Sequence, residues 1–226
     1  AVLTGIAAGG LMGALNGALI HCTGINFFVL TLASGGMLRG ISLMITDGKP
    51  ITKFGKAFMQ LGIGRIGEFQ FPVLFALTLI LLSSPLMFHV KWGNYVQALG
   101  GSETALKRSG VRTGFYRISV HVFLGITAAV TAVIITARLN SAEPNAGMNM
   151  ELDAITAVIM GGTPIRGGNA SIAGTVLAVL ILGIIRNGLT LLSVSSDFQQ
   201  WITGFLLLAS VLISEIRVWN IKALTK

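Results

Sequence analysis

The residues that most often carry catalysis or bind metal ions are few and scattered in this chain. His21, His89 and His121 lie in separate segments without metal-ligand spacing, so the sequence predicts no metal site. The single cysteine, Cys22, excludes an internal disulfide and is expected to pack against its neighbours. The sequence contains no Ser-His-Asp or Cys-His grouping that would indicate a nucleophilic enzyme. We therefore expect that this chain is not an enzyme.

A glycine-rich stretch, GGTPIRGGN at 161–169, invites comparison with a phosphate-binding loop. It lacks the Lys-Ser/Thr pair of such a loop, and no strand is expected before it. The sequence therefore predicts that this chain binds neither ATP nor another cofactor.

Polar side chains within apolar runs are stronger candidates, because a charge in hydrocarbon costs at least about 2.5–3.5 kcal/mol. Arg39 and Arg186 each lie in a run long enough to cross a bilayer. Each arginine either faces a polar path through the membrane or snorkels to an interface. Asn16 and Asn187 are similarly placed, either on such a path or in hydrogen bonds between helices.

The composition indicates a polytopic membrane protein. Of 226 residues, 53% are hydrophobic and only 11% are charged, whereas a soluble domain carries about 25% charged residues. The net charge of +8 does not indicate nucleic-acid binding, because the basic residues are spread through the loops between apolar runs.

A helix that crosses a bilayer needs roughly 20 mostly apolar residues. On this basis the sequence predicts an all-α integral membrane protein with about six full transmembrane helices, a short or broken membrane helix and a helix in one connecting loop. The six predicted spans are 1–20, 26–46, 69–90, 118–137, 171–190 and about 198–216.

The segment 151–162, ELDAITAVIMGG, is apolar but too short to cross alone. It is either a broken helix beside a transport path or a short helix buried against its neighbours. Glu151 and Asp153 begin it, where we expect each carboxylate to meet the helix dipole; the alternative for both is substrate binding. Glycines in GGLMG, ASGG and VIMGG are expected to allow close helix packing.

The distribution of basic residues among the loops predicts the orientation of the chain across the membrane. Loops 21–25, 91–117 and 163–170 share a side with the C-terminus and together with it hold about nine Lys/Arg. The loops predicted on the opposite side, 47–68, 138–150 and 191–197, hold about five. The positive-inside rule therefore predicts a cytoplasmic C-terminus.

The loop 91–117 contains SETALKRSG, in which Ser102 is a plausible helix start and Gly110 a stop signal. Leu99, Ala105 and Leu106 are expected to form a small apolar face. Such a helix either docks on a soluble partner or is an ordinary connection at the lipid headgroups.

Four stretches of the chain resemble one family. ALGGSETALKRSGV is similar to the cytoplasmic coupling loop of ribose- and xylose-type bacterial ABC permeases, and ELDAITAVIMGGTPIRGGN to their second hallmark. RNGLTLLSVSSDFQQWITG and FFVLTLASGGMLRGISLMITDGKPI resemble two further segments, in the family's own order. Ser102, Val111 and Asn169 depart from the usual residues, which leaves the subfamily and the sugar open.

The resemblance implies a permease subunit in the bacterial inner membrane, with residues 1–226 forming one transmembrane domain that lacks an N-terminal portion. It implies three partners: a cytoplasmic ABC ATPase that binds the ATP, a periplasmic sugar-binding protein, and a second permease subunit of the same or a related chain. The residues expected to couple to the ATPase are Gly101, Glu103, Ala105, Lys107, Arg108, Ser109 and Gly110. The alternative is an ion-coupled secondary transporter, which would need more ionisable groups deep in the spans.

Overall fold

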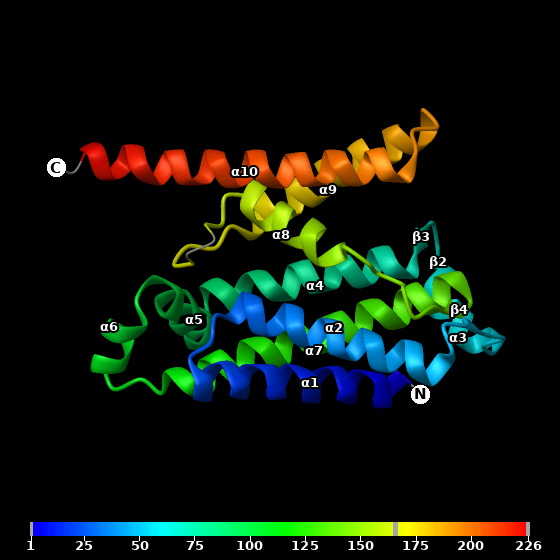
Figure 1. Cartoon of the computed structure of the whole chain (residues 1–226), viewed down its shortest axis with the longest axis horizontal. Helices are drawn as coiled ribbons and strands as arrows, with labels where there is room; N and C mark the ends of the chain where they lie inside the picture. The colour runs from blue at the N-terminus through cyan, green and yellow to red at the C-terminus, as the bar shows by residue number, and fades with distance from the viewer. Residues whose placement is uncertain (1, 165–166, 225–226) are drawn as a thin grey trace. The chain divides into compact units, whose positions relative to one another are not determined.

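The computed structural model describes residues 2–164 and 167–224, with side chains described as far as Ser214 (Figure 1). Arg166 and the side chains of the basic tail, both counted in the orientation, lie outside this description. The chain divides into two compact units, which are described separately below.

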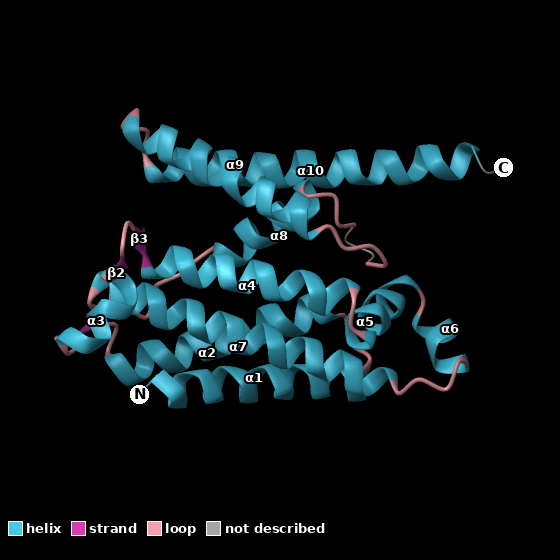
Figure 2. Cartoon of the chain, turned by 180° about the vertical axis from the view of Figure 1, so that it is seen from behind, coloured by secondary structure: helices cyan, strands magenta, loops and turns pink. Residues whose placement is uncertain are grey.

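Helices make up most of the described residues. In chain order they are α1 (Val2–Thr23), α2 (Phe27–Thr46), α3 (Lys56–Ile63), α4 (Phe71–Phe88), α5 (Lys91–Gly101), α6 (Glu103–Arg108), α7 (Thr113–Leu139), α8 (Met150–Met160), α9 (Ile172–Leu191) and α10 (Ser196–Leu224). Four two-residue strands, coloured magenta where visible in Figure 2, are β1 (Ile51–Thr52), β2 (Arg65–Ile66), β3 (Phe69–Gln70) and β4 (Ser141–Ala142).

Within the described residues, six helices are long and apolar enough to cross a membrane: α1, α2, α4, α7, α9 and the 196–214 part of α10. This confirms the predicted all-α class and its six spans. The segment expected to be short is α8, which has 11 residues. At 1.5 Å per residue α8 is about 16 Å long, roughly half the hydrocarbon thickness of a bilayer.

Two predicted loops contain more structure than expected. The segment 47–68 includes β1, α3 and β2, and the segment 91–117 begins with α5. Two side-chain contacts link α5 to α7: the Trp92 Nε1 donates to the Ser119 Oγ at 2.9 Å, and the rings of Tyr95 and Tyr116 lie 5.1 Å apart. These partners lie more than 20 residues away along the chain, so local sequence signals did not indicate them.

The first unit comprises residues 1–96 and 104–147, and its main contact is between α1 and α7. Glycines spaced four residues apart on α1 permit this contact. A Cβ at Gly9 would lie 2.5 Å from the Ala129 Cβ, and a Cβ at Gly13 would overlap the His121 carbonyl oxygen. Packing is thus the role of the GGLMG glycines, as expected, whereas nothing lies within 4 Å of such a Cβ at Gly35 or Gly36 of ASGG.

Pairing of β1 with β4 brings two connections of the first unit together. Ile51 pairs with Ala142 and Thr52 with Ser141, in antiparallel register. The connection after α2 and the connection after α7 therefore lie at the same end of their helices. This agrees with the predicted alternation, in which 47–68 and 138–150 share a side.

The second unit comprises residues 97–103 and 148–226, in which α8 packs against both α9 and α10. The buried face of α8 consists of Thr156, Ala157 and Ile159, and α9 contributes Ala178. Thr156 is fully buried and satisfies its hydroxyl by donating to the Leu152 carbonyl at 2.7 Å. One face of the short segment is thus buried within its unit, and the unit also contains a cavity beside its first turn.

Candidate functional site

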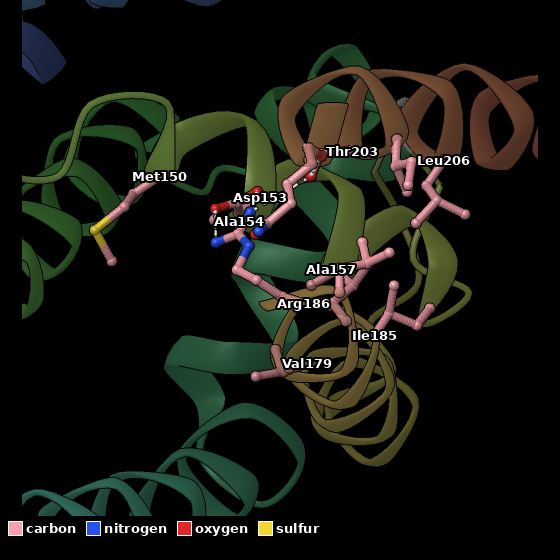
Figure 3. A pocket seen from close by; sticks show the side chains of 14 residues that line it. Met150, Asp153, Ala154, Ala157, Val179, Ile185, Arg186, Thr203 and Leu206 are labelled. Carbon is pink, nitrogen blue, oxygen red and sulfur yellow. Dashed lines mark hydrogen bonds and ion pairs between the residues drawn. The ribbon is translucent and has the colours of Figure 1, made fainter. Parts of the chain in front are cut away.

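A cavity of about 310 Å³ lies among α8, α9 and α10, within the second unit (Figure 3). Its polar lining comes from four side chains: Asp153, Arg186, Gln199 and Thr203. The other lining residues are apolar or glycine. An apolar pocket with a few convergent polar groups is the usual form of a small-molecule site.

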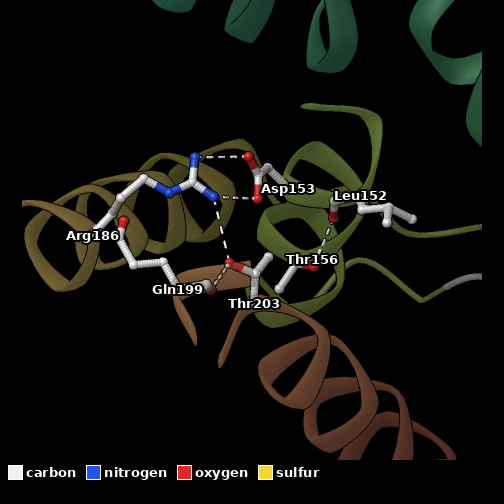
Figure 4. A network of polar contacts seen from close by, with 6 residues as sticks. All are labelled: Leu152, Asp153, Thr156, Arg186, Gln199 and Thr203. Carbon is white, nitrogen blue, oxygen red and sulfur yellow. Dashed lines mark hydrogen bonds and ion pairs between the residues drawn. The ribbon is translucent and has the colours of Figure 1, made fainter. Parts of the chain in front are cut away.

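Two opposite charges meet at the wall of this cavity. The Arg186 Nη1 donates to the Asp153 Oδ2 at 2.9 Å, and the Nη2 donates to Oδ1 at 2.7 Å. The Nη2 also donates to the Thr203 Oγ1 at 3.4 Å (Figure 4). A bidentate pair of this kind fixes the planes of both groups as well as their distance. The arrangement places a carboxylate, a guanidinium and a hydroxyl in a defined geometry.

Three helices position these groups. Asp153 lies in the first turn of α8, where its backbone N–H donates to the Asn149 carbonyl at 3.3 Å. Arg186 lies about one turn before the end of α9. On α10, the Thr203 hydroxyl donates to the backbone carbonyl of Gln199 at 3.1 Å. The side-chain Nε2 of Gln199 in turn donates to the backbone carbonyl of Val194 at 3.0 Å. The site therefore requires all three helices to be packed together.

The structure gives Asp153 a contact beyond the expected one. It lies in the first turn of α8, as predicted, and its carboxylate also forms the ion pair with Arg186 across 33 residues of sequence. Sequence analysis likewise did not single out Thr203 or Gln199. A signal was present, because residues 199 and 203 are polar and four apart on the same helix, which places them on one face.

The four predicted path residues are divided between the two units. Arg186 lines the cavity, but Asn187 is exposed and is not among the lining residues. Asn16, on α1, and Arg39, on α2, are both half-buried and belong to the first unit. Of the four, the structure places Arg186 alone at the described cavity, and a path role for the others stays a prediction.

A second cavity, of about 570 Å³, lies beside the other end of α8. Asn169, Ser210 and Ser214 are among its lining residues. Leu206 lines both cavities, and the lining residues of α10 follow one helix face from Gln199 to Ser214. The two cavities therefore follow one another along α10, with Leu206 between them.

The predicted helix in the loop 91–117 is present as α6 and ends where expected. Gly110 has a φ of +80°, its N–H donates to the Lys107 carbonyl at 3.0 Å, and the Val111 N–H donates to the Leu106 carbonyl at 3.4 Å. This is the Schellman termination that a glycine favours. The apolar face is smaller than predicted, since Leu106 is buried but Ala105 is exposed.

Over most of their length, these elements match known transport proteins. Residues 1–211 match the family described as branched-chain amino acid transport system / permease component. The chain belongs to this permease family. A permease is a transport subunit and not an enzyme, and the family requires no cofactor, in agreement with the sequence analysis.

Curated relatives of the permease include several sugar transport proteins. It is 37% identical over 217 residues to the ribose import permease protein RbsC of Escherichia coli K12, covering 94% of this chain and 68% of the relative. It is 35% identical over 216 residues to the D-allose transport system permease protein AlsC of the same strain, covering 96% and 66%. It is 30% identical over 203 residues to the L-arabinose transport system permease protein AraH, also of that strain, covering 90% and 62%. No solved structure matches the chain.

These relatives confirm the resemblance to ribose-type permeases. The permease spans about two thirds of the length of the relatives it matches. With its six candidate spans, it is a multi-pass membrane protein.

The two motifs that carried the resemblance meet in the second unit of the permease. A Cβ at Gly100, in the last turn of α5, would lie 2.7 Å from the Gly168 backbone nitrogen. Gly167 and Gly168 have φ angles of +79° and +97°, which side chains other than glycine rarely adopt. Glycines on both sides thus allow backbone to lie against backbone, next to the predicted coupling residue Gly101. The assignment of the seven coupling residues stays a prediction.

Proposed function

We propose that this chain forms the membrane path of a bacterial ABC importer for a small sugar or sugar-like solute, driven by a separate ATPase subunit. The observation that carries this proposal is the match to three permeases named for ribose, D-allose and L-arabinose, each over at least 90% of the chain. Because the three names cover different monosaccharides, they favour the class of solute without choosing one member.

The geometry of the second unit supports a transport role. A transported neutral solute needs a few polar contacts at membrane depth and space in which to move. The cavity at Asp153 and Arg186 and the second cavity beyond Leu206 offer both along one helix face. Charged groups in membrane spans are retained mainly for function, which adds weight to this face.

The proposal includes the partners. A cytoplasmic ATPase would dock on the segment that contains Gly101, Glu103, Ala105, Lys107, Arg108, Ser109 and Gly110, where Lys107, Arg108 and Ser109 are exposed. A periplasmic sugar-binding protein would deliver the solute to the opposite side. A second permease subunit, identical or related, would complete the path in the inner membrane, with the C-terminus of this chain in the cytoplasm and both compact units forming one transmembrane domain.

One observation favours a second candidate. Asp153 places a carboxylate among the membrane helices, and ion-coupled secondary transporters use such groups to carry protons or sodium. Against this candidate, both carboxylate oxygens already accept hydrogen bonds from Arg186. An importer that works by ion exchange would have to break this pair in each cycle.

The deciding experiment uses the full-length protein purified in mild detergent. Mass spectrometry of the co-purifying proteins is expected to find an ATPase with a phosphate-binding loop. In proteoliposomes with that ATPase and the binding protein, uptake of radiolabelled D-ribose, D-allose or L-arabinose should require ATP and should persist with a protonophore. Uptake by the permease alone, abolished by the protonophore and independent of ATP, would establish the secondary transporter instead.

A further inference from the structure

The wall formed by Asp153, Arg186 and Thr203 is open to whatever fills the cavity. Arg186 has 53% of its side chain exposed and Asp153 has 26%. Both residues belong to helices of a membrane protein, and Arg186 lies within a full span. A guanidinium half exposed to hydrocarbon would be strongly unfavourable, so this face meets either water or polar groups. A cavity that is hydrated or occupied by a polar solute would meet this requirement.

The charges at the wall restrict which solute fits. The pair Asp153–Arg186 is neutral as a whole, so it does not by itself favour a solute of either charge. It does present acceptors and donors next to each other: the carboxylate oxygens beyond their bonds to Arg186, the remaining guanidinium N–H groups, and the Thr203 hydroxyl. Adjacent hydroxyl groups, which donate and accept at once, complement such a wall.

The remaining walls are apolar. Val179, Ile202 and Leu206 lie around the same cavity as the polar groups. A pyranose or furanose ring has hydroxyl groups at its edge and C–H groups on its faces, so it can meet both kinds of wall together. A volume of about 310 Å³ is at the lower end of the range of roughly 300–1,000 Å³ for small-molecule sites. This size suits a single monosaccharide.

We propose that the cavity among α8, α9 and α10 is a binding site for one uncharged monosaccharide on its way through the membrane, with Asp153, Arg186 and Thr203 as its hydrogen-bonding contacts. This proposal rests on the function proposed above. It deepens that function by naming the contact residues. It also makes charged sugars, such as sugar phosphates, poor solutes of this site, because the neutral pair and the apolar walls would leave their charge uncompensated.

The first test removes one contact and keeps the fold. Thr203→Val deletes the hydroxyl, and Thr127→Val is a matched control: Thr127, on α7 in the other unit, donates to the Phe123 carbonyl at 3.1 Å, as Thr203 does to that of Gln199. The reconstituted importer with full-length permease is assayed for uptake and ATP hydrolysis. We expect Thr203→Val to lower the number of sugar molecules moved per ATP at least about tenfold, which corresponds to about 1.4 kcal/mol. Thr127→Val should leave this ratio unchanged, and equal ratios in both variants would overturn the proposal.

The second test separates solute contact from a purely structural tie between α8 and α9. The double variant Asp153→Arg/Arg186→Asp preserves an opposite-charge pair but exchanges the donors and acceptors. We expect it to assemble with the ATPase and hydrolyse ATP while its uptake stays at or below about one tenth of the original. Uptake restored to the original rate would show that pairing alone matters and would refute the site. If the exchanged pair prevents assembly, the result for Thr203→Val decides.

Failure of the proposed function has a different signature. A wild-type complex that moves none of the three monosaccharides with ATP would reject the sugar importer, and with it this site. A wild-type complex that moves sugar while Thr203→Val matches its control would reject the site alone. Inhibition of uptake by D-ribose 5-phosphate on the permease side, with the binding protein saturated by D-ribose, would also contradict the preference for uncharged sugars.

Discussion

The backbone of Gly174, in the first turn of α9, lies directly against the carbonyl oxygen of Gly161, just after α8. A Cβ at position 174 would overlap that oxygen and would lie 2.7 Å from the Ser171 Oγ. Ser171 is the N-cap of α9, and its Oγ accepts the Gly174 N–H at 3.2 Å. The cap of one helix and the end of the other therefore share a space that admits no side chain at position 174.

This relationship makes Gly174→Ala a sensitive probe of the second unit. We expect the substitution to destabilise the protein by about 1–3 kcal/mol, because the carbonyl at Gly161 is backbone and cannot move aside alone. The measurement is the thermal unfolding midpoint of the full-length permease in detergent. Gly188→Ala, in the same helix and with nothing within 4 Å, is the control and should be neutral or stabilising. Equal midpoints for the two variants would contradict the packing argument.

Leu206 separates the two cavities, so its size should control passage between them. We expect Leu206→Trp to lower sugar uptake at least about tenfold while ATP hydrolysis continues, since the larger indole would occupy space in the cavities that Leu206 lines. Leu208→Trp changes an exposed residue of the same helix and should have little effect. The readout is the initial rate of radiolabelled sugar uptake in proteoliposomes. A loss of the same size in both variants would point to damage to α10 in place of a blocked path.

Lys107 and Arg108 are exposed at the end of α6, where the proposed ATPase docks. Reversal of both charges, Lys107→Glu/Arg108→Glu, should uncouple ATP hydrolysis from transport and reduce uptake by about tenfold or more, because mismatched charges oppose docking. Membrane insertion should be intact. The control for the change in charge alone is Lys49→Glu, which replaces an exposed lysine between α2 and β1. Normal uptake by the double variant would refute the coupling role of this segment.

The orientation can be tested with single cysteines after Cys22→Ser removes the native thiol, which is exposed. Ser109→Cys should be labelled by an impermeant maleimide only from the cytoplasmic side. Thr52→Cys, in β1, should be labelled from outside. The predicted orientation places the loop 47–68 on that side, and the pairing of β1 with β4 puts the connection after α7 there as well. Labelling of Ser109→Cys in intact cells would invert the proposed topology.

Several elements of the fold follow from local sequence signals. The predicted spans 26–46 and 171–190 correspond to α2 and α9, each within one residue at either end. Apolar length determines such a helix, because a backbone in hydrocarbon must satisfy its own hydrogen bonds. Side chains next to the first turn determine where it begins: the Asn26 Oδ1 accepts the Phe28 N–H, as the Ser171 Oγ accepts that of Gly174. The glycine stop at Gly110 is equally local.

Other features depended on contacts between distant segments. The residues of α5 did not by themselves reveal that Trp92 and Tyr95 would contact α7. Nor did the spacing of glycines show that GGLMG would contact another helix while ASGG would have nothing within 4 Å. Helix packing decides both, because the same small residue suits a close contact or an open surface.

The candidate site likewise combines features that the sequence determined with features that only the tertiary structure decided. The sequence by itself determined that this chain is a multi-pass membrane permease and that Arg186, a charge within a span, needed an explanation. Only the tertiary structure decided that Asp153 and Thr203 are its partners and that a cavity lies beside them. The physical reason is that the cost of a charge in hydrocarbon can be judged from one segment, whereas its compensation depends on which other helices bring polar groups within hydrogen-bond distance.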